Sequence, residues 1–459
     1  MAGYWALAGA VTGWLRSRGV SNPFLTAAIW ICADAGVARF PFGGLSWGEI
    51  GYAFHDIAPA RAVASVGGVT LVTYLAVALN AFLAELWTER GRIADASRAL
   101  LGVTVVAAIV VGATVTRADP PVSGSLRVAI VQGNDLDRDL TPAELDARYL
   151  PASHFDLARQ ITDPVDLIVF PESSMDADPR TDSYVKSNLE QIARRHHAWV
   201  LANATVDAPP NGAKALNLDV LFDPNGDIVG TYAKRHLVPY GEYVPFRHEL
   251  QSFIPELDKV PRDYQPGRSA GLFPVADTQI GTLICFESAF GYQLRPLVRD
   301  GAQMLVVSTN NRSYRRSANS AQHVAISQMR AAETGRPVVH AAISGISAFI
   351  DADGVVRDQT KLFQRAVIQT TIATTTGQTP YVRYGEWALA ASALAVLVAS
   401  VIALVRSRRR QAVVPTTPET KVPVESRSFG YNVNDSPTNG GRQAPAHPEP
   451  ESEESPSTT

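Results

Sequence analysis

Apolar residues gather in long uncharged runs near both ends of the chain. Three of these runs contain no Asp, Glu, Lys or Arg, namely Ala62–Ala84, Ala99–Thr116 and Trp387–Val405. A helix needs about 20 mainly apolar residues to cross the ~30 Å hydrocarbon core of a bilayer, so these runs predict three membrane helices. Two weaker candidates come first, the short run Tyr4–Leu15 and the run Pro23–Ala38, which contains an aspartate.

The arginines that flank these runs predict how the chain is oriented, because cationic segments tend to stay in the cytoplasm. With about four helices in residues 1–118 and one at 387–405, the arginines near the helix ends divide nine to four between the two sides. The nine are Arg16, Arg18, Arg90, Arg92, Arg98, Arg406, Arg408, Arg409 and Arg410, and the four are Arg39, Arg61, Arg117 and Arg383. We therefore expect a multi-pass membrane protein with residues 119–380 outside the cytoplasm and the C-terminus inside.

The last part of the chain, residues 411–459, is rich in Pro, Ser, Thr and Glu and has few large apolar side chains. Such a segment cannot bury enough apolar surface to offset the entropy that ordering would cost. We expect a disordered cytoplasmic tail.

Composition narrows the functional classes further. The chain has 46% hydrophobic and 19% charged residues, and 41 Lys+Arg against 44 Asp+Glu give a formal net charge of −3. This balance provides no basic field that would attract nucleic acid, so a nucleic-acid partner is disfavoured. Cys32 and Cys285 lie in an apolar run and a strand-like run, and we do not expect them to form a disulfide. Cys32 is expected only to pack in the membrane, whereas an unpaired Cys285 outside the cytoplasm points to a chemical role.

Between the membrane runs, the pattern changes to short β-branched stretches separated by turns and amphipathic segments. Stretches such as RVAIVQGN, DLIVFP, TQIGTLI and AQMLVVSTN predict strands buried on both faces. Asp182–His197 and Ser320–Glu333 have helical spacing, with Gln, Arg and Glu on the outer face. The turn sequences DPNGD and DADG stand between strand-like runs and predict hairpins. The pattern as a whole predicts an α/β domain.

Three reactive side chains stand where predicted strands end. Glu172 follows DLIVFP, Lys234 follows IVGTYA, and Cys285 follows TQIGTLI. A thiol needs a base to become a nucleophilic thiolate, Glu172 can supply that base, and Lys234 can stabilise the thiolate and a tetrahedral oxyanion. Each residue also has a plainer interpretation, as a buried small hydrophobe, a turn residue or part of a solvated basic cluster.

The segments around these residues carry a family likeness. FPESS around Glu172, YAKRHLVPYGEYVPFR around Lys234 and ICFES around Cys285 resemble the three catalytic motifs of the nitrilase (carbon–nitrogen hydrolase) superfamily. With the run QHVAISQMRAAETGRPVVHAAISGISAFIDADG and the flanking membrane runs, they are similar to the apolipoprotein N-acyltransferase family over roughly residues 23–405. Members of that family normally have eight membrane helices, so we expect the N-terminal bundle of this chain to be shortened.

The resemblance implies a nitrilase-like αββα sandwich inserted between transmembrane helices. It implies that Glu172 is the general base, Lys234 the oxyanion stabiliser and Cys285 the nucleophile. Glu242 in GEYVP and Glu287 in ICFES match supporting acidic residues of the family. No metal ion or cofactor is implied.

The resemblance also implies an activity in the bacterial inner membrane. A fatty acyl chain would pass from a phospholipid to Cys285 as a thioester, and then to the N-terminal α-amine of diacylglyceryl-cysteine in a lipoprotein. The segment Phe40–Tyr52 has two interpretations, a segment at the membrane–water interface beside the active site, where Trp47 and Tyr52 are favoured, or an ordinary loop of the aromatic belt. Two alternatives remain open, a membrane-tethered amidase or nitrilase-like hydrolase, and an inactive scaffold that docks another membrane protein.

Overall fold

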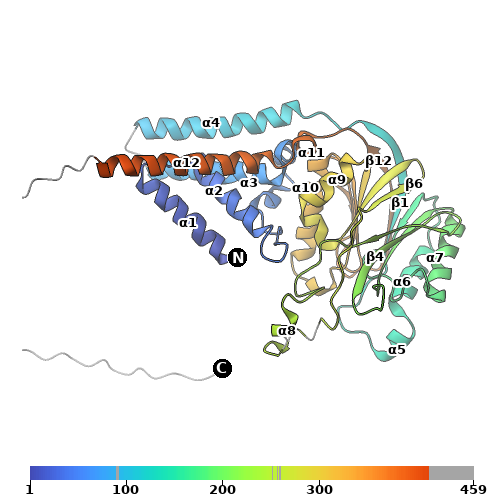
Figure 1. The fold of residues 1–459 in the computed structure, drawn as a ribbon. Coiled ribbons are helices and arrows are strands. Elements are labelled where there is room, and N and C mark those ends of the chain that lie inside the picture. The colour runs from blue at the N-terminus through green and yellow to red at the C-terminus, as the bar shows by residue number, and fades with distance from the viewer. Residues whose placement is uncertain (89–92, 251, 256, 258–259, 413–459) are drawn as a thin grey trace, which may run out of the picture. The chain divides into compact units, whose positions relative to one another are not determined.

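The computed structural model describes residues 1–412 except 89–92, 251, 256 and 258–259 (Figure 1). Apart from its first two residues, which end the last helix, the tail predicted at 411–459 lies outside the described residues. The predicted α/β domain is built on two six-stranded sheets. The first sheet has the order β12 (Ala366–Thr375), β1 (Val122–Gln132), β2 (Leu167–Val169), β3 (Trp199–Asp207), β4 (Ala215–Phe222) and β5 (Ile228–Ala233).

The second sheet repeats this arrangement. Its order is β11 (Val356–Gln359), β10 (Ala348–Ile350), β9 (Val338–Ala342), β8 (Met304–Thr309), β7 (Thr278–Ile284) and β6 (Leu272–Val275). In each sheet three neighbouring strands are parallel, β1–β2–β3 in the first and β7–β8–β9 in the second, and the outer strands are antiparallel. Since parallel strands end together at one edge, side chains just beyond β2, β7 and β8 are brought to the carboxyl edges of the two sheets.

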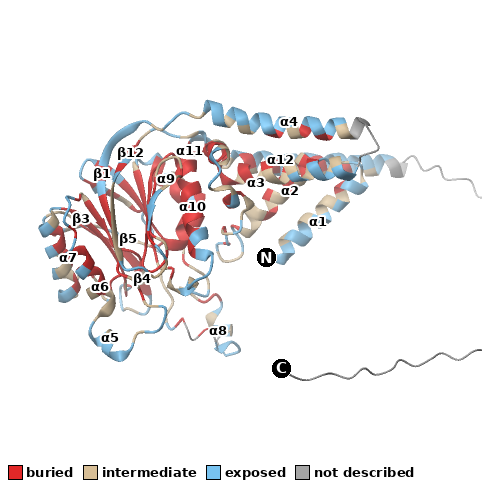
Figure 2. Ribbon diagram, turned by 180° about the vertical axis from the view of Figure 1, so that it is seen from behind, coloured by how far each residue is buried: buried red, intermediate tan, exposed pale blue. Residues whose placement is uncertain are grey.

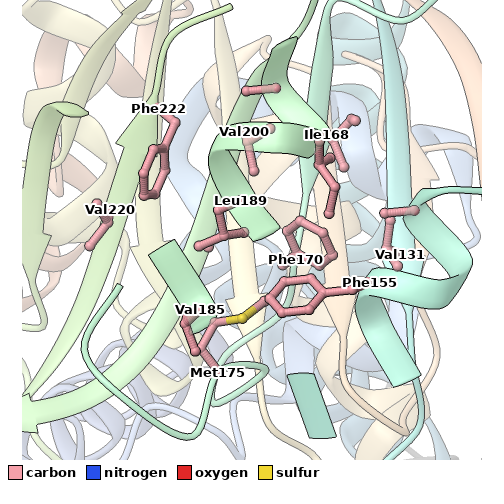
Figure 3. Packing of buried hydrophobic residues seen from close by; sticks show 14 of the residues in the cluster. Val131, Phe155, Ile168, Phe170, Met175, Val185, Leu189, Val200, Val220 and Phe222 are labelled. Carbon is pink, nitrogen blue, oxygen red and sulfur yellow. The ribbon is translucent and has the colours of Figure 1, made fainter. Parts of the chain in front are cut away.

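Helices cover the outer face of each sheet. Phe155 on α6 (Tyr149–Ala158) and Leu189 on α7 (Ser183–His196) pack in one cluster with Phe170 and Val200 of the first sheet (Figure 3). The second sheet packs against α9 (Gly291–Arg299) and α10 (Asn319–Thr334). A third cluster, with members such as Val128 on β1 and Val306 on β8, joins the inner faces of the two sheets. The predicted αββα sandwich is therefore confirmed.

Most predictions of individual turns and helices are confirmed. The turns 223–227 and 351–354 connect antiparallel pairs, β4–β5 and β10–β11, and both predicted hairpins are confirmed. The two predicted helices correspond to α7 and α10 within one residue at each end. The prediction that the polar residues of α10 face solvent is wrong, because Gln328, Arg330 and Glu333 are all buried. Figure 2 shows α10 almost entirely as buried ribbon, since it is covered on the side away from the second sheet as well.

That covering comes mainly from α3 (Ala58–Thr88), which is one of five apolar helices at the two ends of the described chain. They are α1 (Ala2–Ser17), α2 (Pro23–Val37), α3 (Ala58–Thr88), α4 (Ile93–Thr116) and α12 (Trp387–Ala412). Among the described residues, three segments are long and apolar enough to cross a membrane, in α3, α4 and α12, and each contains one of the three predicted runs. The remaining helices are short, namely η1 (Ile50–Phe54), α5 (Pro142–Asp146), α8 (Arg247–Leu250), η3 (Cys285–Ala289), η4 (Arg312–Tyr314) and α11 (Pro380–Tyr384).

The run predicted as a single span at Ala62–Ala84 is broken inside α3. Gly67 and Gly68 have non-helical dihedral angles, and Gly68 has a φ of 74°. A Cβ atom on Gly68 would lie 2.6 Å from the ring of Tyr381, so only glycine fits this backbone and this approach. The amide of Val69, freed by the break, donates to Glu333 Oε1 on α10 at 2.6 Å. The helix therefore restarts at the junction with the αββα domain, and about 20 residues follow the break, a length that is sufficient to cross a bilayer.

The segment predicted at the membrane–water interface contributes to the same junction. Tyr52 is buried, and its hydroxyl donates to the carbonyl of Ala289. The Arg330 guanidinium donates to the Tyr52 hydroxyl and to Glu333. Trp47 is half-buried and donates to Gln322 Oε1 at 2.9 Å. This junction connects the apolar helices directly to the turn that carries Cys285.

Candidate active site

Cys285 stands at the sharp bend where β7 ends and η3 begins. Its φ is 53°, in the left-handed region that non-glycine residues rarely adopt, so the surrounding structure must hold it there. The side chain is buried. Burial, with a contribution from Glu172, raises the pKa of the Cys285 thiol to about 12, although Lys234 acts in the opposite direction. The thiol is therefore protonated at neutral pH and requires a base before it can attack.

Glu172 lies two residues beyond Phe170, past the carboxyl end of β2, and is buried. Both carboxylate oxygens are held by donors. Oε1 accepts from Asn217 Nδ2 at 2.6 Å and from Lys234 Nζ at 3.2 Å, and Oε2 accepts from the Asn310 amide at 2.7 Å. These donors fix the orientation of the carboxylate that the sequence marks as the base.

Lys234 directly follows β5, and only 1% of its surface is exposed. Its Nζ lies 3.2 Å from Glu172 Oε1 and 2.8 Å from Glu242 Oε1. Burial would lower the pKa of Lys234, but the two carboxylates outweigh it and raise that pKa well above its ordinary value. Lys234 is therefore a fixed positive charge at the carboxyl edge of the first sheet.

Glu242 belongs to the loop that follows Lys234. Its Oε1 accepts from Lys234 and, at 3.2 Å, from Asn217 Nδ2, while Oε2 accepts from the Val238 amide at 2.8 Å. Glu242 is therefore a second carboxylate that holds Lys234. The sequence-predicted residues Glu172, Lys234 and Glu242 thus form one hydrogen-bonded group, in which Glu172 and Lys234 are buried and Glu242 is half-buried.

Glu287 has a different place. It is fully buried on η3, two residues after Cys285, and burial raises its pKa. Among the described contacts, its carboxylate accepts from the Tyr232 hydroxyl at 2.8 Å, from the Ile284 amide at 2.8 Å and from the amides of Arg235 and His236. Glu287 thus braces the Cys285 turn against the segment that carries Lys234.

Sequence reasoning missed a chain of buried polar groups behind the base. Asn203 on β3 donates to Asn217 Oδ1 and to Asp219 Oδ1, each at 2.9 Å, and accepts from the Ser173 amide next to Glu172. Asp219 also accepts from Thr282 on β7 at 2.7 Å, which links the two sheets. A signal was present, because polar residues at 217 and 219 are two apart in an otherwise apolar strand and must share one face.

A cavity of about 490 Å³ opens beside the sulfur. Its wall is mainly apolar, and it is lined by Cys285 together with Phe42, Leu45, Trp47, Tyr240 and Tyr314. Phe42, Leu45 and Trp47 come from the segment between α2 and η1, so the apolar N-terminal part of the chain completes the site. A long apolar substrate that lies in such a cavity would have its reacting group next to the thiol.

Comparisons with known proteins agree with this architecture. The carbon–nitrogen hydrolase family matches residues 127–381, and the apolipoprotein N-acyltransferase N-terminal domain matches residues 1–82. The apolipoprotein N-acyltransferase of Geobacter metallireducens is 30% identical over 410 residues, which cover 86% of this chain and 78% of that protein. The apolipoprotein N-acyltransferase of Azotobacter vinelandii is 30% identical over 406 residues, 84% of this chain and 76% of that protein.

Among solved structures, Nit3 of Saccharomyces cerevisiae, a member of branch 10 of the nitrilase superfamily, is 16% identical with a TM-score of 0.42. The match covers 66% of this chain and 98% of that protein. The sequence matches carry the family assignment, since they span both the apolar N-terminal helices and the αββα domain. Together with the three long apolar helices, they are consistent with a bacterial membrane protein. With these matches spread over most of its length, the chain belongs to the apolipoprotein N-acyltransferase family.

Proposed function

We propose that the protein transfers a fatty acyl chain from a phospholipid to the α-amine of the diacylglyceryl-cysteine at the N-terminus of a lipoprotein. The observation that carries this proposal is the hydrogen-bonded group of Glu172, Lys234 and Glu242 next to a cysteine thiol that opens on an apolar cavity. The curated relatives named for this activity support the choice of acceptor.

In the first half of the reaction, Cys285 attacks the sn-1 ester of the phospholipid. The thiol proton passes to Glu172 as the sulfur bonds to the carbonyl carbon, and Lys234 Nζ stabilises the negative charge on the carbonyl oxygen. When the tetrahedral intermediate collapses, the carbon–oxygen bond to glycerol breaks and Glu172 returns the proton to the departing lysophospholipid. The enzyme keeps the acyl chain as a thioester.

In the second half of the reaction, the lipoprotein amine enters the site as the second substrate. Its nitrogen attacks the thioester carbon, Glu172 accepts a proton from the nitrogen, and the carbon–sulfur bond breaks. The amide product leaves, and the thiolate of Cys285 recovers its proton from Glu172. Both half-reactions use the same three side chains, so one site is sufficient for the whole cycle.

The apolar helices give a reason for a membrane-bound site. Both substrates carry acyl chains, and a protein held in the bilayer meets them by diffusion in two dimensions. Phe42, Leu45 and Trp47 line the cavity from a segment that directly follows the apolar helix α2, so an acyl chain can reach the thiol while remaining in apolar surroundings.

We also propose a multi-pass arrangement in the inner membrane, with the αββα domain outside the cytoplasm and the C-terminus inside. Arg406 on α12 donates to the Gly19 carbonyl at 2.9 Å, so the basic ends of α1 and α12 meet at one place, as a common cytoplasmic end requires. Labelling with a membrane-impermeant maleimide in spheroplasts tests this orientation. In a background without the native cysteines, Ser183→Cys on α7 should label from outside, whereas Ser407→Cys should label only after lysis. The reverse pattern would refute the orientation.

The activity is tested with a phospholipid that carries an isotope label only in its sn-1 chain. The purified protein should gain the mass of that chain on the peptide containing Cys285, and hydroxylamine should remove it. A synthetic diacylglyceryl-cysteine peptide should then receive the label on its amine. Cys285→Ser should abolish both steps, and Cys32→Ser serves as the matched control that leaves them intact.

Other outcomes would contradict the proposal. Transfer of the labelled chain to water alone, with ammonia released from small amides, would indicate a hydrolase. Persistent labelling of the Cys285→Ser variant would show that the thioester is not on this residue. Absence of any acyl-enzyme in a folded native protein would favour a scaffold role.

A further inference from the structure

The carboxyl end of β8 meets both the nucleophile and the base. Thr309, the last residue of β8, is fully buried, and its hydroxyl lies 3.2 Å from Cys285 Sγ. The next residue, Asn310, donates its backbone amide to Glu172 Oε2 at 2.7 Å. Two consecutive residues thus contact the sulfur and the carboxylate between which a proton must move.

A second group of polar side chains surrounds Thr309. Thr309 Oγ1 lies 2.8 Å from Asn311 Oδ1 and 3.3 Å from His323 Nδ1. His323, on α10, places its other ring nitrogen, Nε2, 2.8 Å from Ser288 Oγ and 3.2 Å from the carbonyl of Cys285. These contacts also hold the backbone of Cys285, which explains how its positive φ is maintained.

The protonation of His323 follows from its neighbours. Burial lowers the pKa of His323 to about 4, so the ring is neutral and carries one N–H. The Cys285 carbonyl can only accept, so the N–H belongs on Nε2, where Ser288 Oγ is a further acceptor. Nδ1 is then an acceptor that faces Thr309 and Asn311.

The amide of Asn311 decides where the Thr309 proton points. In one orientation of the amide, Asn311 Nδ2 is buried and has no hydrogen-bond partner among the described residues, while Oδ1 faces Thr309 Oγ1 and the accepting Nδ1 of His323. The two ends of an amide are distinguished only by their hydrogen bonds, so exchanging them gives the better arrangement. Nδ2 then donates to both neighbours, and Thr309 Oγ1, which now accepts from Asn311, keeps its own proton for Cys285 Sγ.

We propose that Thr309 is a catalytic hydrogen-bond donor to the sulfur of Cys285, held in this role by Asn311 and neutral His323. This inference rests on the proposed thioester chemistry and adds a fourth group to it. When the thiol proton moves to Glu172, the hydroxyl of Thr309 stabilises the thiolate without giving up its own proton. When the thioester is broken by the amine, the same donor stabilises the departing sulfur.

Besides the Thr309 hydroxyl, several other groups around the sulfur affect the stability of the thiolate. The carboxylates of Glu172 and Glu242 disfavour a thiolate, and the ammonium of Lys234 favours it. Tyr314 on η4 and His323 on α10 face the same region, and both are uncharged at neutral pH because burial raises the pKa of Tyr314 and lowers that of His323. A hydrogen bond to a charged group that is removed from water changes an equilibrium by about tenfold or more.

The test measures the nucleophilicity of Cys285 rather than turnover. In a Cys32→Ser background, the rate of alkylation of Cys285 by iodoacetamide is followed from pH 6 to 10. Thr309→Val, which keeps the shape and removes the donor, should slow alkylation about tenfold at each pH and move the profile upward by about one pH unit. Thr309→Ala should do the same if valine disturbs folding, and Thr309→Ser should restore the native rate within about threefold.

Thr334→Val is the matched control, because Thr334 is a buried threonine on α10 whose hydroxyl donates to the Arg330 carbonyl at 2.7 Å. Its alkylation profile should equal that of the native protein. Equal rates for Thr309→Val, Thr309→Ala and the native protein would overturn the inference. Equal slowing in all three Thr309 variants would also overturn it, since the hydroxyl would not be the cause. A protein that shows the expected alkylation pattern but never carries an acyl chain would refute the proposed function and leave this inference standing.

Discussion

Replacing Lys234 with Met tests the electrostatics of the site directly. Methionine has nearly the length of lysine but no charge, and Lys234 contacts both the buried carboxylate of Glu172 and the half-buried carboxylate of Glu242. Glu172 Oε1 and Glu242 Oε1 contact the same nitrogen at 3.2 and 2.8 Å, so they are no more than about 6 Å apart. With an effective dielectric constant near 20, two charges at that distance repel by about 3 kcal/mol. Loss of the ion pair should bring the total destabilisation to about 3–5 kcal/mol.

The repulsion acts in the folded protein, where the two carboxylates are held together. The Lys234→Met protein should therefore unfold at a lower temperature than the native protein. Thermal unfolding in detergent, together with the acyl-enzyme assay, measures this. Lys186→Met is the matched control, because the side chain of Lys186 on α7 is half-buried and its Nζ lies as far as 4.0 Å from Glu190 Oε1, its carboxylate partner among the described residues. A Lys234→Met protein with native Tm at pH 8, or with native acylation, would refute the reasoning.

Three further predictions concern stability. Burial raises the pKa of Asp219 to about 7, so the folded protein keeps this proton to a higher pH than the unfolded chain does. The contribution of Asp219 to stability therefore falls, by at most about 4 kcal/mol, as the pH rises from about 4 to 7. Asp219→Asn should remove this fall, which Tm measurements across the same pH range would show. Gly68→Ala should cost about 1–3 kcal/mol through the left-handed backbone and the contact with Tyr381, and an unchanged Tm would contradict this. Phe155→Ala should leave a cavity in the core shown in Figure 3 and cost about 3–5 kcal/mol by denaturant unfolding, with the far-UV spectrum retained.

The motifs around Glu172, Lys234 and Cys285 could be recognised from sequence because each lies in a local pattern. An apolar run that ends in a polar residue indicates a strand end, and parallel strands bring their ends together. The roles of Glu242 and Glu287 could be separated only in the structure. Glu242 turns toward Lys234, whereas Glu287, two residues from the sulfur, turns toward the backbone of the neighbouring strand segment.

By itself the sequence determined the class of the domain, the three long apolar helices, the hairpins and the order of the reactive residues, since periodicity, turn chemistry and run length are local properties of a chain. Only the tertiary structure decided which helices, strands and side chains contact one another. It buried the polar face of α10 between the second sheet and α3, broke α3 at Gly68 where Tyr381 and Glu333 approach, and placed Thr309 and His323 around the sulfur. These contacts join residues far apart in the chain, and the free energy that selects them comes from burial and hydrogen bonds that exist only once the layers have packed.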